Sequence, residues 1–369
     1  MPQTLEPLKL PLDAAHRALG AAMGVEGGWE VPLSYTGPLA EASEVRRMAC
    51  VFDISHVGRI RIRGSGALEL VEKLCTTDAV HQEDDTAACT LLLNGSGGIL
   101  ADAIVARLEG FWLITTDPCN RQKVLAHATS VCEGMSAKVD DQTEKGAMLA
   151  VSGSAAREVL DSVLPESPGD LPPGAAKIGS MMIARYIVMR TGFTGMWGLE
   201  VILPKMFIAK AWRFITEKAD EKCLKPAGMA ARDILRIEAG ICRYGHELNE
   251  TIDPFTAGLE SLVDFEHEFI GRQALTEIRS RGISRRRVGL RFDCPEVARR
   301  GDTVFNSDGF EVGAITSGTF SAALDCPIAM AYVSPPASDG GAVLEVEVAS
   351  TGAKVSATVT DLPFVPRSA

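Results

Sequence analysis

Apolar and polar residues follow a helical period within residues 226–260, the longest stretch that combines helix signals, loop signals and clustered ionisable groups. Steps of one, three and four predict one buried helix face, made of Met229, Ala230, Ile234, Ile237 and Ile241. Arg232 and Arg236 lie one turn apart on another face. Asp253-Pro254 then prevents the helix from continuing, because proline restricts the residue before it. Taken alone, the stretch favours an ordinary amphipathic helix with solvated arginines.

The same spacing predicts further helices along the chain. A helix is predicted within residues 64–75. Ser65 is available as its N-cap, and Leu68, Val71 and Leu74 form its expected inner face. The other predicted helices cover residues 12–24, 38–49, 119–132, the second half of 147–164, and 206–218.

Strands are predicted where apolar residues alternate or form short runs. In residues 51–64, Ile60 and Ile62 face one way and Arg59, Arg61 and Arg63 the other, which is typical of a half-buried strand. Residues 89–116 give the clearest antiparallel signal, because apolar runs are separated by Gly-Ser-Gly-Gly and Glu-Gly turns. Further strands are expected in 27–35, the first half of 147–164, and 184–204, and the chain after residue 287 is predicted to form a small all-β barrel or sandwich.

Composition narrows the function classes. The chain has 369 residues and a formal net charge of −11, which argues against binding to a nucleic-acid backbone. Its nine cysteines contain no CxxC pair, so free thiols and a cytoplasmic location are expected. Six arginines nevertheless cluster at one junction, which predicts a solvated linker or a site for an acidic partner: Arg279, Arg281, Arg285, Arg286, Arg287 and Arg291.

An ordered set of segments resembles the aminomethyltransferase (glycine-cleavage T-protein) family of folate-dependent one-carbon enzymes. The segments are GGWEVPLSY, VFDISHVG, TLLLNGSGGILAD, RTGFTGMWGLEVILP, GMAARDILRIEAGICRYGHEL, FIGRQAL, RRVGL, EVGAITSGTFS and the terminal LPFVP. The resemblance implies an α+β fold with three domains in a cloverleaf around a central folate channel. The expected domains are residues 1–50 with 146–280, residues 51–145, and an all-β barrel at 281–369.

The resemblance also implies roles for four residues. Asp102 matches the family acid beside the folate nitrogens that receive the one-carbon unit, where a carboxylate stabilises developing positive charge. Glu200 matches the acid that holds the pterin, Phe193 an aromatic residue against the ring, and Arg232 an arginine of the folate site. From the residues alone, Asp102 is an ordinary hairpin cap and Glu200 an outward-facing strand residue.

Several positions depart from the family pattern. Val57, Cys89 and Asp117 replace a methionine, a tyrosine and an asparagine that the family usually has in its folate channel. Met196-Trp197 replaces a Glu-Asp pair. A smaller side chain at Val57 and at Cys89 is expected to reshape the ring pocket.

The implied activity is transfer of an aminomethyl group from the dihydrolipoyl arm of a lipoylated H-protein to tetrahydrofolate, with release of ammonia. The altered pocket leaves two alternatives open: a folate-dependent demethylase of a small methylated compound, and a folate-binding paralogue without transferase activity. His56 and His246 have no metal-ligand spacing and are expected to be loop or core residues.

Overall fold

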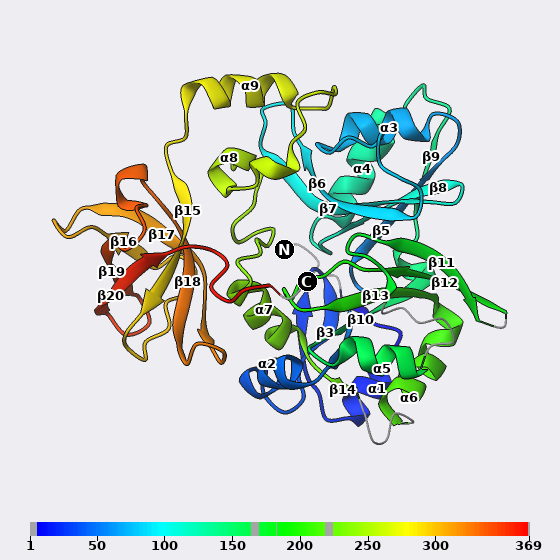
Figure 1. The fold of residues 1–369 in the computed structure, drawn as a ribbon, viewed down its shortest axis with the longest axis horizontal. Helices are drawn as coiled ribbons and strands as arrows, with labels where there is room; N and C mark the ends of the chain where they lie inside the picture. Colours follow the sequence, from blue (N-terminus) through cyan, green and yellow to red (C-terminus); the bar gives the residue numbers. More distant parts are fainter. Residues whose placement is uncertain (1–5, 164–169, 182, 218–223, 368–369) are drawn as a thin grey trace.

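The computed structural model describes residues 6–163, 170–181, 183–217 and 224–367. It shows a mixed α+β protein whose lobes surround a common centre, with the C-terminal β-domain to one side (Figure 1). This confirms the predicted fold class. No helix in the described part of the chain is long and apolar enough to cross a membrane.

The largest open sheet holds six strands in the order β11-β12-β13-β10-β4-β14. Because side chains alternate across a strand, each strand serves two cores. Val51, Leu149 and Leu199 pack toward α5 (Ala156–Val163) and α6 (Ile208–Glu217). Phe52 and Met148 pack on the opposite side toward α7 (Met229–Glu238). The strands are β4 (Cys50–Asp53), β10 (Gly146–Ser152), β11 (Ala176–Met181), β12 (Ala184–Met189), β13 (Gly198–Pro204) and β14 (Lys225–Pro226).

A second sheet of five strands has the order β6-β7-β8-β5-β9. Its strands are β5 (Gly58–Arg63), β6 (Thr86–Leu93), β7 (Ile99–Leu108), β8 (Phe111–Thr116) and β9 (Lys138–Asp141). Helices α3 (Ala67–Leu74) and α4 (Arg121–Val131) cover one face, where Leu70 and Val124 pack against Ile60 and Ile62. The predicted hairpins of residues 89–116 are thereby confirmed.

The C-terminal domain is a closed barrel with the order β15-β18-β17-β16-β19-β20, which confirms the predicted barrel. Its strands are β15 (Arg286–Phe292), β16 (Thr303–Phe305), β17 (Glu311–Ser321), β18 (Cys326–Val333), β19 (Val343–Val348) and β20 (Ala353–Thr360). Helices α8 (Pro254–Ala257) and α9 (Arg272–Arg281) precede it. After β20 the chain crosses back to the centre (red in Figure 1), where the Val365 amide donates to the Glu238 carbonyl at 2.9 Å.

A small sheet near the N-terminus corrects one prediction. The helix expected over 12–24 ends early as α1 (Asp13–Ala18), because Gly20 turns the chain with a φ of 76°. The chain then forms β2 (Ala22–Glu26), which pairs with β3 (Trp29–Ser34) and leads to α2 (Pro38–Arg47). A short strand β1 (Leu8–Lys9) completes this sheet.

Two further sequence predictions were wrong in detail. Gly66 rather than Ser65 is the N-cap of α3, and Leu68 is exposed while Leu70 is buried. Arg59, expected on the solvated face of its strand, is only 1% exposed. Its guanidinium donates to four backbone carbonyls, those of Ser55, Val57, Thr143 and Gly146, which is how this buried cation is solvated.

Candidate functional site

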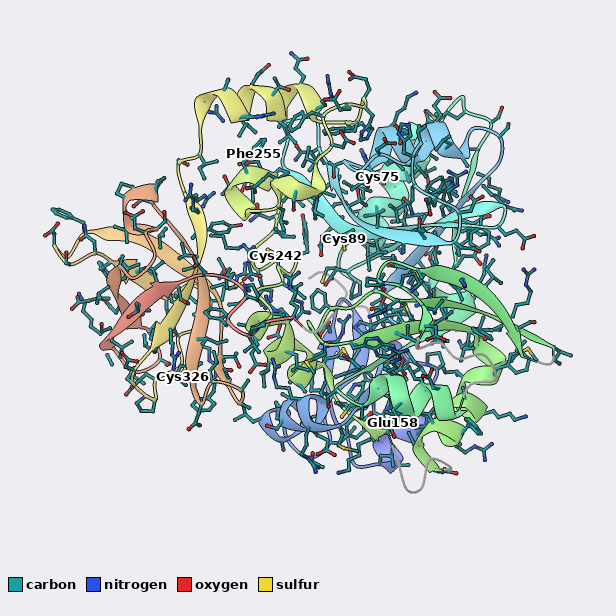
Figure 2. The ribbon with its side chains drawn as sticks, viewed as in Figure 1. Cys75, Cys89, Glu158, Cys242, Phe255 and Cys326 are labelled. Atoms are coloured by element: carbon teal, nitrogen blue, oxygen red, sulfur yellow. The ribbon has the colours of Figure 1, made fainter. Side chains whose placement is uncertain are left out.

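A cavity of about 460 Å³ lies where the lobes meet, lined from β2, β6 to β8, the start of β13, α7, the segment 240–262 and the C-terminal tail. Cys89 and Cys242, both labelled near the centre of Figure 2, belong to its wall. The structure brings all seven residues named from the sequence to this one cavity: Val57, Cys89, Asp102, Asp117, Phe193, Glu200 and Arg232.

Asp102 lies inside β7, opposite Leu91 of β6, and does not cap the hairpin turn. Asn94 does so instead, since its side-chain oxygen accepts from the amides of Ser96 and Gly98 at 3.0 Å each. The Oδ1 atom of Asp102 is buried and has no hydrogen-bond partner among the described residues. Burial raises the pKa of Asp102 to about 7, and the nearby Asp117 carboxylate adds to the rise. Asp102 can therefore exchange a proton near neutral pH.

Glu200 points inward from β13 and is 6% exposed, in contrast to the outward position expected of it from its strand alone. Its Oε2 accepts a hydrogen bond of 2.7 Å from the Thr191 hydroxyl. Its Oε1 lies 3.8 Å from Nη2 of Arg232. Each oxygen keeps room for a further donor, because a carboxylate oxygen accepts about two hydrogen bonds.

Phe193 and Arg232 form the flat part of the wall. The guanidinium carbon of Arg232 lies 4.4 Å from the centre of the Phe193 ring, within the range of a cation–π contact. The buried Nε of Arg232 has no hydrogen-bond partner among the described residues. A donor without an acceptor beside an aromatic face suits a flat ligand that carries a carbonyl or carboxylate.

The remaining three predicted residues shape the cavity. Val57 packs against the core around α7, and Cys89 is exposed toward the cavity. Asp117 follows β8 directly, and its Oδ1 accepts from the Cys119 amide at 2.8 Å. Small side chains at residues 57 and 89 leave the cavity open.

Sequence reasoning missed two ionisable groups of this cavity, Arg243 and Glu26, and did not predict that the core residue His56 lies beside them. Arg243 and Glu26 come from segments far apart in the chain and form an ion pair of 2.9 Å. Glu26 also lies 3.4 Å from Nε2 of His56, which the sequence analysis had assigned to a loop or core role. His56 is 1% exposed, lines the cavity, and its Nδ1 has no partner among the described residues. No local pattern identified Glu26, because the predicted helix 12–24 obscured the strand that carries it.

Two other sequence expectations lie outside the cavity. Met196 and Trp197 pack against hydrophobic cores and do not line it, so the departures there do not alter the pocket directly. Of the arginine cluster, only Arg287 reaches the cavity, and it donates to the carbonyls of Ala257 and Gly240 at 2.8 and 2.9 Å. Arg285 and Arg286 are exposed.

Comparison with known proteins agrees with this architecture. Residues 12–267 match the family model described as GCVT N-terminal domain, and residues 285–366 match the glycine cleavage T-protein C-terminal barrel domain. An aminomethyltransferase of Saccharopolyspora erythraea is 34% identical over 98% of this chain and 99% of its own length. One of Rubrobacter xylanophilus is 36% identical over 97% of this chain and 94% of its own length.

A solved structure extends the likeness to three dimensions. The glycine cleavage system aminomethyltransferase T of Bartonella henselae superposes with a TM-score of 0.90 at 31% identity, over 97% of this chain and 98% of that one. A cavity with convergent polar groups is typical of a small-molecule site, and the match to these named relatives makes the chain a transferase. The chain belongs to the glycine cleavage T-protein family, whose members carry the name aminomethyltransferase.

Proposed function

We propose that this protein is a tetrahydrofolate-dependent aminomethyltransferase. It transfers a one-carbon unit from the aminomethyl-dihydrolipoyl arm of an H-protein to tetrahydrofolate and releases ammonia. One observation carries the proposal. Residues from separate segments line a single cavity, and three of them carry a buried polar atom without a partner among the described residues: His56 Nδ1, Asp102 Oδ1 and Arg232 Nε. Native proteins satisfy most buried polar atoms, so three residues with such atoms around one cavity support a ligand whose binding supplies the missing partners.

The residues of the wall fit the pterin end of tetrahydrofolate. Glu200 offers two oxygens to the parallel donors of the ring, the 2-amino group and N3–H, in the manner of a bidentate carboxylate. Phe193 offers an apolar face, and Arg232 Nε offers a donor to a ring carbonyl. Bound tetrahydrofolate supplies the nitrogen atoms that accept the one-carbon unit.

The protein's own contribution to the chemistry is placement and proton control. Asp102 lines the same cavity as Glu200, with a pKa of about 7 caused mainly by burial. Its ionised form stabilises positive charge that develops beside it, and its protonated form returns a proton. Holding two reactants in one cavity supplies much of the remaining rate, because it converts an encounter into a local reaction.

The partner and the location complete the proposal. A lipoylated H-protein would approach as a transient partner, and exposed Arg285 and Arg286 give it a basic surface near the barrel junction. Every cysteine in the described part of the chain is free, which suits a reducing compartment and a cytoplasmic location.

The activity test compares donors at constant tetrahydrofolate. Purified protein with aminomethylated H-protein should release ammonia only when tetrahydrofolate is present, and Asp102→Asn should slow that release by about 10²-fold or more. Turnover of sulfonio, ammonio or methoxy donors without H-protein would replace this proposal by the demethylase. Tetrahydrofolate binding without turnover of either donor class would replace it by the non-catalytic paralogue.

A further inference from the structure

Arg243 gathers three carboxylates at the cavity wall. Its Nη2 lies 2.9 Å from Glu26, its Nη1 lies 3.6 Å from Asp233, and its Nε lies 3.9 Å from Asp117. These acids come from β2, α7 and the loop after β8, so one side chain joins three separate segments. The Arg243 amide also donates to Glu247 at 3.0 Å, which fixes its backbone. All four members of this cluster line the cavity.

Asp117 links the cluster to the strand that carries Asp102. Asp117 follows Thr116, whose hydroxyl donates to the Asp102 carbonyl at 3.1 Å. Asp102 lies in β7 and Asp117 directly after the neighbouring strand β8, and both line the same cavity. Two carboxylates this close repel each other unless a cation stands beside one of them.

We propose that Arg243 is a positioning residue, which holds the Asp117 carboxylate on its own side of the cavity and so keeps Asp102 able to ionise during turnover. The proposal rests on the aminomethyltransferase function. Arg243 itself touches neither the Asp102 carboxylate nor, on the geometry above, the pterin wall of Glu200 and Phe193. Its main action passes through the position of Asp117, and the direct effect of its charge on Asp102 is the smaller part.

The electrostatics of the cavity agree with this arrangement. Burial would raise the pKa of Glu26, but the hydrogen bond from His56 and the charge of Arg243 outweigh it and lower that pKa to about 2. Besides Asp117, the charged groups that act on Asp102 are Glu247 from the segment after α7, which raises its pKa, and Arg243, which lowers it. Glu200 and Arg232 face the same cavity from β13 and α7 and remain unchanged in the test below.

The test is a double-mutant cycle on the titration of Asp102, read by carbon NMR of aspartate-labelled protein, with Asp102→Asn to assign the signal. Arg243→Gln should move the titration midpoint upward by about half a pH unit or more, a threefold change in the ionised ratio. Asp117→Asn should move it downward. In the Asp117→Asn background, Arg243→Gln should have less than half its effect.

Arg300→Gln, an exposed arginine of the barrel, is the matched control and should leave the midpoint unchanged. Equal shifts in both backgrounds would show that Arg243 acts on Asp102 only through its own charge and not through Asp117, and no shift would reduce Arg243 to a structural residue; either result overturns the proposal. The pH profile of ammonia release should move with the NMR midpoint. If wild type shows no release at all, the proposed function fails, while the NMR cycle still decides the role of Arg243.

Discussion

The two arginines of α7 lie one turn apart and serve opposite purposes. Arg236 is 0% exposed and faces the barrel, where its guanidinium bonds Asp233 at 2.9 Å, Glu247 at 2.8 Å and Ser317 at 2.8 Å. Arg232 faces the cavity, where its nearest acid, Glu200, is 3.8 Å away and its Nε has no partner among the described residues.

The surroundings of the two arginines differ in the same way. Around Arg236, Glu247 also accepts from Thr316 at 2.7 Å and Ser317 at 2.6 Å, so the junction between α7 and the barrel is a closed network. Around Arg232, atoms of His56 and Asp102 are likewise left without partners. A saturated network fixes two domains together, whereas unsatisfied groups in a cavity hold hydrogen-bonding capacity for a ligand.

The largest expected effect is a loss of stability when the hydrogen-bonded network around Arg236 is broken. Arg236→Met removes a buried charge and leaves Glu247 unpaired, which should cost about 3–5 kcal/mol of unfolding free energy. Urea unfolding measures it. Arg232→Met is the matched control on the same helix and should cost less than about 1 kcal/mol, because its charge is poorly compensated in the protein alone. Similar losses for both variants would remove the distinction between the two sides.

The next effect is the loss of folding stability that the buried Asp102 carboxyl of the cavity causes at high pH. Because the pKa of Asp102 is raised to about 7, the folded protein holds a proton between about pH 4 and pH 7 that the unfolded chain has released. Stability should therefore fall as pH rises through this window, and Asp102→Asn should abolish that part of the fall. At pH 8, Asp102→Asn should gain at most about 4 kcal/mol of unfolding free energy over wild type, since about three pKa units are worth about 1.4 kcal/mol each. This gain should vanish near pH 4. An equal gain at both pH values would contradict the assignment.

The smallest effect lies outside both regions, on the exposed arginines of the barrel junction. Arg285→Glu with Arg286→Glu should raise the apparent KM for H-protein by about fivefold, since exposed charges are worth up to about 1 kcal/mol. High salt should reduce the difference. Arg287 must stay, because it supports the carbonyls of Ala257 and Gly240. Arg300→Glu serves as the control, and an unchanged KM in the double variant would exclude this surface as the docking site.

The sequence predicted the fold and part of the cavity, and the reasons differ. The spacing of apolar residues and turns predicted α7, the hairpins of β6 to β8 and the barrel, because each of these depends on residues that are close in the sequence. The family motifs assigned Glu200, Arg232 and Asp102 to one folate site, but their place around one cavity came only with the structure. The domain limits remain a prediction.

What the sequence did not reveal depends on contacts between distant segments. Glu26 and Arg243 meet only after β2 folds against the loop that follows α7. The alternation of isoleucine and arginine predicted that Arg59 faces solvent. It is buried instead, and four backbone carbonyls accept hydrogen bonds from its guanidinium. Leu70 rather than Leu68 is buried beside Val71 and Leu74, because the packing of α3 on its sheet selects the buried face. The spacing of apolar residues predicts whether a segment is a helix or a strand, and the elements that pack on it decide which face is buried.

The central claim is that the unsatisfied wall of the cavity is a tetrahydrofolate site. Calorimetric titration of wild type, Glu200→Gln and Asp102→Asn with tetrahydrofolate tests it most directly. The account predicts that wild type binds, that Glu200→Gln loses about 100-fold in affinity through weakened charged hydrogen bonds, and that Asp102→Asn binds nearly as well as wild type. No binding by wild type at millimolar tetrahydrofolate, or equal binding by the Glu200 variant, would contradict it.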